Sequence, residues 1–261
     1  MLCQIIIFLS LIFFYLIIAN QKETFSNQLN KKDVRFIHVG KTGGSTLGGC
    51  FKFKQWHCTK PKFNKNEKYI ISIRNPLKLF VSNINNEKKV VQALDHYNNT
   101  KEVLDIPAHE RLKSLINKNI KYSFSKDIHN FLKINSLDQI CINIKNIDKK
   151  YLVGHTLKNI SWYLNNGKFI EKYHKNIVYV TKQETLNDDI KNIAKMLNMN
   201  INLDKRKDKR VNNNKDDYLS PLAIKNLKDF FKDTEYKTLQ TLYNYGFINK
   251  EYLDYCYTYN I

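Results

Sequence analysis

The residues best suited to chemistry follow an apolar run early in the chain. Val34–Val39 is mostly apolar and β-prone, and a glycine-rich segment follows it directly. That segment reads Gly40, Lys41, Thr42, Gly43, Gly44, Ser45 and Thr46. Glycines let backbone N–H groups turn inward, and a helix starting near Leu47 adds the partial charge of its N-terminus to that of Lys41. The pattern predicts an anion-binding loop with Ser45 and Thr46 as hydroxyl donors, although a purely structural glycine turn has the same pattern.

The loop differs from the Walker A motif of nucleotide-hydrolysing enzymes. That motif carries a glycine five residues before its Gly-Lys pair, and this position holds Arg35. A phosphate-binding loop of another kind is therefore the better interpretation.

A second stretch adds a further anion ligand. Tyr69–Ile73 has the pattern of a buried strand, and Arg74 follows it, with Pro76 at the first turn of an expected helix. Ser82 lies eight residues after Arg74. An arginine at a strand end and a helical serine suit a second phosphate, which the arginine grips bidentately. A surface arginine and an ordinary helix serine are the alternative.

Together the two stretches resemble the sulfotransferases that use 3′-phosphoadenosine 5′-phosphosulfate (PAPS). The segment Lys41–Thr46 is similar to the family's 5′-phosphosulfate loop, and Arg74-Asn75-Pro76 with Ser82 is similar to its 3′-phosphate site. The stretch His38–Gly44 looks most like membrane-bound carbohydrate sulfotransferases of the heparan sulfate 2-O and 6-O type. The resemblance covers about residues 34–86, with weaker similarity beyond, and the ordered pair of motifs is its specific part.

The resemblance implies a sulfuryl transfer from PAPS to a hydroxyl or amine acceptor, on a carbohydrate in the first instance. PAPS would be bound by the loop, Arg74 and Ser82, and no metal is expected. Lys41 is the natural group to stabilise the leaving oxygen, because a compact ammonium can follow developing charge. Tyr218 is reminiscent of the family's C-terminal nucleotide-binding region, to which Asn212–Asn214 would also belong.

The acceptor's proton requires a base, and histidine suits this role near neutral pH. His57 lies between the two phosphate motifs, where similar glycan sulfotransferases carry a histidine near the acceptor; a structural histidine beside Trp56 is the alternative. His155 is the second candidate. We expect His38 to be a core or supporting residue, and Glu184 to be mainly structural.

Composition limits the function classes. The net charge is +19, but the lysines are scattered and no zinc-finger or RNA-recognition signature is present, so we expect no nucleic-acid partner. The five cysteines include no C-x-x-C pair, which argues against metal coordination. Cys50 and Cys58 are close enough in sequence to form a disulfide, and free buried thiols are the alternative.

The N-terminal segment indicates a membrane partner. Residues 2–19 are uncharged and near the length of a bilayer span, which favours a signal anchor over a cleaved signal peptide. Residues 21–33 read as a short stem, and 34–261 as one sulfotransferase domain. Lysines follow the apolar run and none precedes it, which by itself predicts a cytoplasmic domain. The resemblance instead implies a domain in the Golgi lumen. Asn98 and Asn159 each begin an Asn-x-Ser/Thr glycosylation sequon.

The remaining pattern predicts the elements that position these residues. Further strands are expected at 55–58 and 177–181, and helices at 47–54, 76–89, 151–164, about 186–199, from Pro221 with Ser220 as N-cap, and 234–245. Strands alternating with helices predict an α/β fold, a P-loop-like three-layer α/β/α domain with a central parallel sheet. Ligands of such sheets lie outside the carboxyl ends of the strands, where both motifs fall.

Two further function classes stay open. A P-loop nucleotide kinase or NTPase would bind ATP with magnesium. A non-catalytic member of the same fold would bind an anionic glycan or nucleotide without transferring a group.

Overall fold

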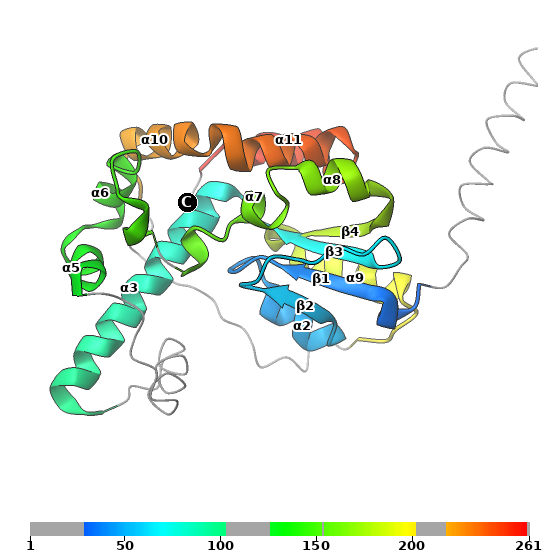
Figure 1. Ribbon diagram of the computed structural model, residues 1–261, viewed down its shortest axis with the longest axis horizontal. Coiled ribbons are helices and arrows are strands. Elements are labelled where there is room, and N and C mark those ends of the chain that lie inside the picture. Colours follow the sequence, from blue (N-terminus) through cyan, green and yellow to red (C-terminus); the bar gives the residue numbers. More distant parts are fainter. Residues whose placement is uncertain (1–28, 103–125, 153, 202–217, 260–261) are drawn as a thin grey trace, which may run out of the picture.

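The computed structural model describes residues 29–102, 126–152, 154–201 and 218–259 (Figure 1). In this part of the chain a four-stranded, all-parallel sheet has the order β2-β1-β3-β4. Its strands are β1 (Val34–His38), β2 (Lys54–His57), β3 (Lys68–Ile73) and β4 (Ile177–Lys182). The predicted α/β class and parallel sheet are confirmed, and each expected strand lies within two residues of its predicted bounds.

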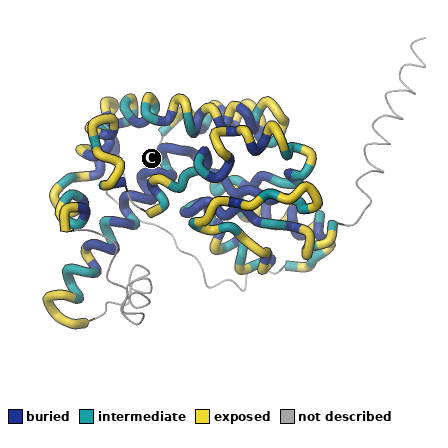
Figure 2. Tube along the Cα trace, in the orientation of Figure 1, coloured by how far each residue is buried: buried dark blue, intermediate teal, exposed yellow. Residues whose placement is uncertain are grey.

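Helices cover both faces of the sheet. Consecutive strand residues point to opposite faces, so the apolar strands present side chains that need to be buried on each side. Phe36 and Ile70 belong to a core shared with α2 (Gly44–Phe51) and α9 (Leu186–Met196). Ile37 and Ile71 belong to a larger core on the other face, shared with α3 (Pro76–Thr100). The two central strands, β1 and β3, are buried on both faces, which explains why their sequences read as almost continuous apolar runs (Figure 2).

The remaining α-helices pack in the larger core that includes α3, some over the sheet and others beside α3 itself (Figure 1). They are α5 (Lys126–Ile134), α6 (Leu137–Ile142), α7 (Ile160–Tyr163), α8 (Lys168–Tyr173), α10 (Pro221–Phe231), α11 (Lys237–Asn244) and α12 (Lys250–Cys256). A π-helical turn, Lys232–Tyr236, joins α10 to α11. As expected, Ser220 caps α10 and Pro221 is its first residue.

The single helix predicted over 151–164 is wrong. The chain instead forms two helical turns, Lys149–Tyr151 and Gly154–Thr156, and then α7. Gly154 has a φ of 62°, in the left-handed region that interrupts a helix, and the Asn159 side chain caps α7 by accepting from the Trp162 N–H. Asn159 is therefore an N-cap rather than a mid-helix residue. α12 was not predicted, and α3 extends beyond its predicted end.

Several N-terminal expectations fall outside the described residues, namely the anchor at 1–20 and most of the stem at 21–33. Within the described ranges, the longest apolar helices fall short of what a bilayer crossing requires. The described cysteines, Cys50, Cys58, Cys141 and Cys256, form no disulfide.

Candidate functional site

The glycine loop, Gly40–Thr46, leaves the carboxyl end of β1 and enters α2. Lys41 and Gly43 both have positive φ, 64° and 77°, so the chain makes its tight turn at these two residues. Gly43 is the N-cap of α2, and no side chain caps the helix. The N-terminus of α2 therefore lies at the loop without a capping side chain, a position at which backbone N–H groups can donate to an anion.

Thr42 fixes the loop to the sheet instead of facing outward. Its buried hydroxyl donates to the Val39 carbonyl at 2.6 Å and lies 2.6 Å from the hydroxyl of Ser72 on β3. Ser45 is exposed and Thr46 is partly exposed, so both residues lie nearer the surface than Thr42. The loop thus has a fixed inner threonine and outer hydroxyls, and Thr42 offers a ligand its backbone rather than its side chain.

The structure brings the two predicted motifs together. Arg74, which directly follows β3, donates from Nη1 to the Lys41 carbonyl at 3.2 Å. Lys41 in turn donates from Nζ to Asn86 Oδ1 on α3 at 3.2 Å. Because β1 and β3 are adjacent and parallel, their carboxyl ends place an ammonium and a guanidinium at one edge of the sheet.

The first half of α3 turns a polar face toward the glycine loop. Ser82 and Asn86 are four residues apart and therefore share one side of the helix. Asn83 donates to the His155 carbonyl at 3.2 Å, on the neighbouring side. The Ser82 hydroxyl is buried and has no hydrogen-bond partner within the described part of the chain. Ser82 lies one helical turn before Asn86, the residue that contacts Lys41, and a buried hydroxyl without a partner is a feature that a bound anion would explain.

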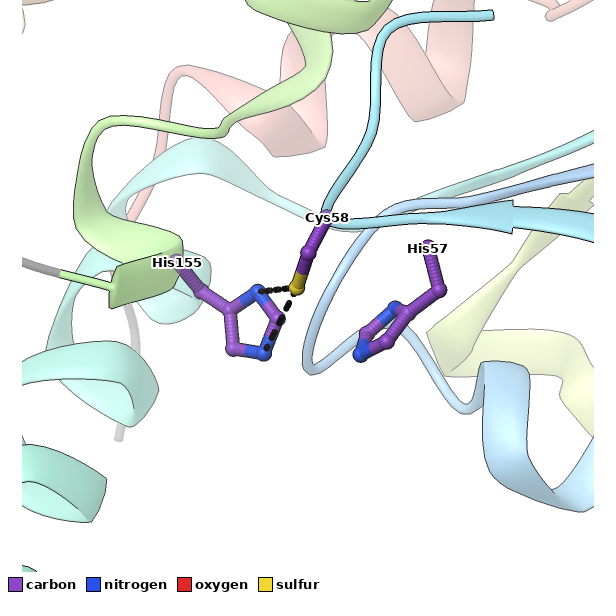
Figure 3. Close-up of side chains that lie close together, drawn as sticks. All are labelled: His57, Cys58 and His155. Carbon is purple, nitrogen blue, oxygen red and sulfur yellow. Dashed lines mark hydrogen bonds between the residues drawn. The ribbon is translucent and has the colours of Figure 1, made fainter. Parts of the chain in front are cut away.

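The two histidines proposed as bases meet beside the glycine loop. The ring centroids of His57, at the end of β2, and His155 are 4.9 Å apart (Figure 3). A Cβ added at Gly40 would come within 2.3 Å of His155 Nδ1, so the imidazole packs directly on the loop backbone. Burial lowers the pKa of His57, while a hydrogen bond with the His38 carbonyl opposes this shift.

His38 supports the site from beneath. Its ring stacks on His57 with centroids 4.1 Å apart, and a Cβ at Gly44 would come within 1.9 Å of it. Burial and the neighbouring His57 lower the pKa of His38 to about 4, so its imidazole is neutral at pH 7. The expectation that His38 is a core or supporting residue agrees with this position.

The remaining predicted residues lie elsewhere. Glu184 has a structural position, because its carboxylate accepts from the Asn75 N–H and the Tyr252 hydroxyl, each at 3.0 Å. Tyr218 is exposed, and the nearby Ser220 N–H donates to Asp138, which puts this stretch beside α6. A role for Tyr218 in adenine binding stays a prediction. Asn212–Asn214 lie outside the described residues.

Sequence reasoning missed Asn83, Asn86 and Cys58. The signal for the asparagines was the polar run Ser-Asn-Ile-Asn-Asn-Glu within an otherwise apolar helix start, whose polar residues recur three and four apart. Cys58 had no such signal, because its neighbour His155 is 97 residues away.

Comparisons with protein-family models, curated proteins and solved structures gave no match for this chain. The function therefore rests on the residues of the site themselves.

Proposed function

We propose that this chain is a PAPS-dependent sulfotransferase with a P-loop-like α/β/α fold. It would transfer a sulfuryl group to a hydroxyl or amine, most naturally on a carbohydrate. The observation that carries the proposal is the contact between Arg74 and the Lys41 carbonyl, which joins the two anion motifs at the carboxyl edge of the sheet.

The residues of this edge fit a ligand with two separate phosphate groups. The N–H groups at the start of α2, with Lys41, suit one of them. Arg74 and the buried, unpaired hydroxyl of Ser82 suit the other. A single mononucleotide phosphate would leave one of these two sets without a partner.

The chain's own groups divide the work of the reaction. PAPS, when bound, supplies an activated sulfuryl group whose transfer needs in-line positioning and charge stabilisation, by analogy with phosphoryl transfer. Lys41 stabilises negative charge at the loop. A ring nitrogen of His57 or His155 takes the proton from the acceptor. His57 is the more accessible of the two, and it lies between the motifs in sequence.

The proposed setting is a membrane. Residues 2–19 act as a signal anchor, and the domain from residue 34 onward lies in the Golgi lumen, where PAPS and glycan acceptors would meet. The positive charge of the chain would favour an anionic glycan.

Calorimetry of the full-length chain in detergent tests the donor site. Adenosine 3′,5′-bisphosphate, the product that PAPS leaves behind, is titrated first, and ATP with Mg²⁺ second. We expect the bisphosphate to bind and Arg74→Ala to weaken it tenfold or more, since a charge-assisted hydrogen bond contributes about 1.5–3 kcal/mol.

Arg35→Ala is the matched control. Arg35 lies near the opposite end of β1 and pairs with Glu67 at 2.9 Å, so its loss should leave bisphosphate affinity unchanged. Binding of ATP with Mg²⁺ in place of the bisphosphate would reject the sulfotransferase and favour the kinase class. Bisphosphate binding without any sulfuryl transfer to a panel of glycans would favour a non-catalytic binding protein.

A further inference from the structure

Cys58 completes a cluster of three metal-binding side chains with His57 and His155 (Figure 3). One donor atom from each residue lies within 4.8 Å of the other two. The Cys58 sulfur is 3.6 Å from Nδ1 and 3.9 Å from Nε2 of His155. The imidazoles converge on the thiol from two different elements, the end of β2 and the turn Gly154–Thr156.

The distances suit a tetrahedral ion. Zinc binds thiolate sulfur at about 2.3 Å and imidazole nitrogen at about 2.0–2.1 Å, so the ligand atoms of a tetrahedral site stand roughly 3.3–3.7 Å apart. The contact between Cys58 and His155 already has this separation. All three donor atoms lie within 4.8 Å of one another, so small side-chain rotations would bring the set to tetrahedral spacing.

Surrounding groups orient two of the three ligands. His57 Nδ1 lies 3.3 Å from the His38 carbonyl, a contact that leaves its Nε2 available. Metal-binding histidines characteristically use one ring nitrogen in this way. The Cys58 N–H donates to the Tyr163 hydroxyl at 2.7 Å, and the Cys58 carbonyl accepts from Lys158 Nζ at 2.7 Å. Cys58 is thus held at a φ of 61°, which a non-glycine residue adopts only when its surroundings impose it.

We propose that His57, Cys58 and His155 bind a zinc ion, with the fourth position open to water or to a ligand. The set of two nitrogens and one sulfur matches zinc's preference, whereas magnesium and calcium prefer oxygen. The nearby ammonium of Lys158 opposes a bare cation, and deprotonation of the Cys58 thiol on binding compensates for that charge.

The site has a consequence that rests on the proposed function. His57 and His155 are the candidate bases, and a coordinated imidazole nitrogen cannot accept a proton. Zinc occupancy would therefore inhibit transfer, while the glycine loop and Arg74 would continue to bind the nucleotide.

Cobalt titration of the reduced, full-length chain in detergent tests the binding site without any assay of transfer. Co²⁺ substitutes for zinc and reports its ligands: a thiolate gives a near-ultraviolet charge-transfer band, and tetrahedral geometry gives intense visible bands. We expect saturation at one ion per chain and loss of both signals when Zn²⁺ is added. Cys58→Ser should abolish the charge-transfer band, and His57→Ala and His155→Ala should each weaken binding by at least about tenfold.

Cys50→Ser and His174→Gln are the matched controls, because Cys50 is on α2 and His174 is in the turn before β4. Both variants should titrate like the unaltered chain. A charge-transfer band that survives Cys58→Ser, or a chain that shows no saturable Co²⁺ signal, would overturn the proposal. Bisphosphate affinity is measured on the same samples: failure there with intact cobalt binding rejects the sulfotransferase alone.

Discussion

The glycine loop and the histidine–cysteine cluster (His57, Cys58, His155) lie side by side but are held in different ways. The loop is attached to the sheet itself, through the contact of Thr42 with Ser72 and that of Arg74 with the Lys41 carbonyl. The cluster depends on a second layer, because His155 and the Tyr163 hydroxyl that holds Cys58 come from the irregular segment between β3 and β4. Loop geometry should therefore resist changes in the covering helices, whereas cluster geometry should follow them.

Glu235 offers the largest test of this difference. It is fully buried in the π-helical turn, and its carboxylate accepts from the Ser161 N–H at the start of α7, the helix that carries Tyr163. Burial raises the pKa of Glu235 from 4.5 to about 7. Between these values the folded chain holds a proton that the unfolded chain has released, so the free energy of unfolding falls as pH rises, by about 3 kcal/mol above pH 7.

Glu235→Gln should remove this contribution, because glutamine stays neutral. Denaturant unfolding at pH 5 and pH 8 would measure it, and the variant should lose less stability than the unaltered chain over this range. The substitution should change cobalt affinity more than bisphosphate affinity, because Glu235 contacts the start of the helix that carries Tyr163. Equal pH dependence of unfolding in the two proteins would contradict the raised pKa of Glu235.

Gly44 tests how closely the loop and the histidines pack. A Cβ at Gly44 would overlap the His38 ring at 1.9 Å, so Gly44→Ala should destabilise the fold by about 1–3 kcal/mol. Gly49 is the control on the same helix: a Cβ there meets nothing within 4 Å, and Gly49→Ala should stabilise by up to about 1 kcal/mol. Thermal unfolding of both variants measures the contrast, and a neutral Gly44→Ala would show that His38 lies elsewhere.

Thr42 and Ser45 separate the structural side of the loop from its ligand side. Thr42→Val removes the buried hydroxyl that contacts the Val39 carbonyl and the Ser72 hydroxyl, and should lower the free energy of unfolding by about 1–2 kcal/mol. Ser45→Ala removes an exposed hydroxyl and should change stability by less than about 0.5 kcal/mol, while weakening bisphosphate binding. Unfolding and calorimetry on the two variants give the comparison, and the reverse pattern would exchange their roles.

The fold and the loop could be predicted from sequence because their signals are local. Val34–Val39 and Tyr69–Ile73 are apolar runs, and the glycines and Arg74 follow them immediately. Parallel pairing of β1 with β3 then suffices to bring the motifs together. The cluster had no local signal: no short spacing joins Cys58 to His155, and their contact arises from tertiary packing. The break at Gly154 also escaped prediction, because a helical pattern does not reveal a residue held in the left-handed region.

In the proposed donor site, Arg74 binds a second phosphate on a nucleotide that the glycine loop holds. A cycle of four affinities tests this role, with adenosine 3′,5′-bisphosphate and adenosine 5′-phosphate each titrated into the unaltered chain and Arg74→Ala. Removing the 3′-phosphate should cost the unaltered chain at least about tenfold in Kd, and should cost Arg74→Ala much less, because only Ser82 would remain to bind that phosphate. An equal loss in both proteins would place the 3′-phosphate away from Arg74 and contradict the proposed donor site.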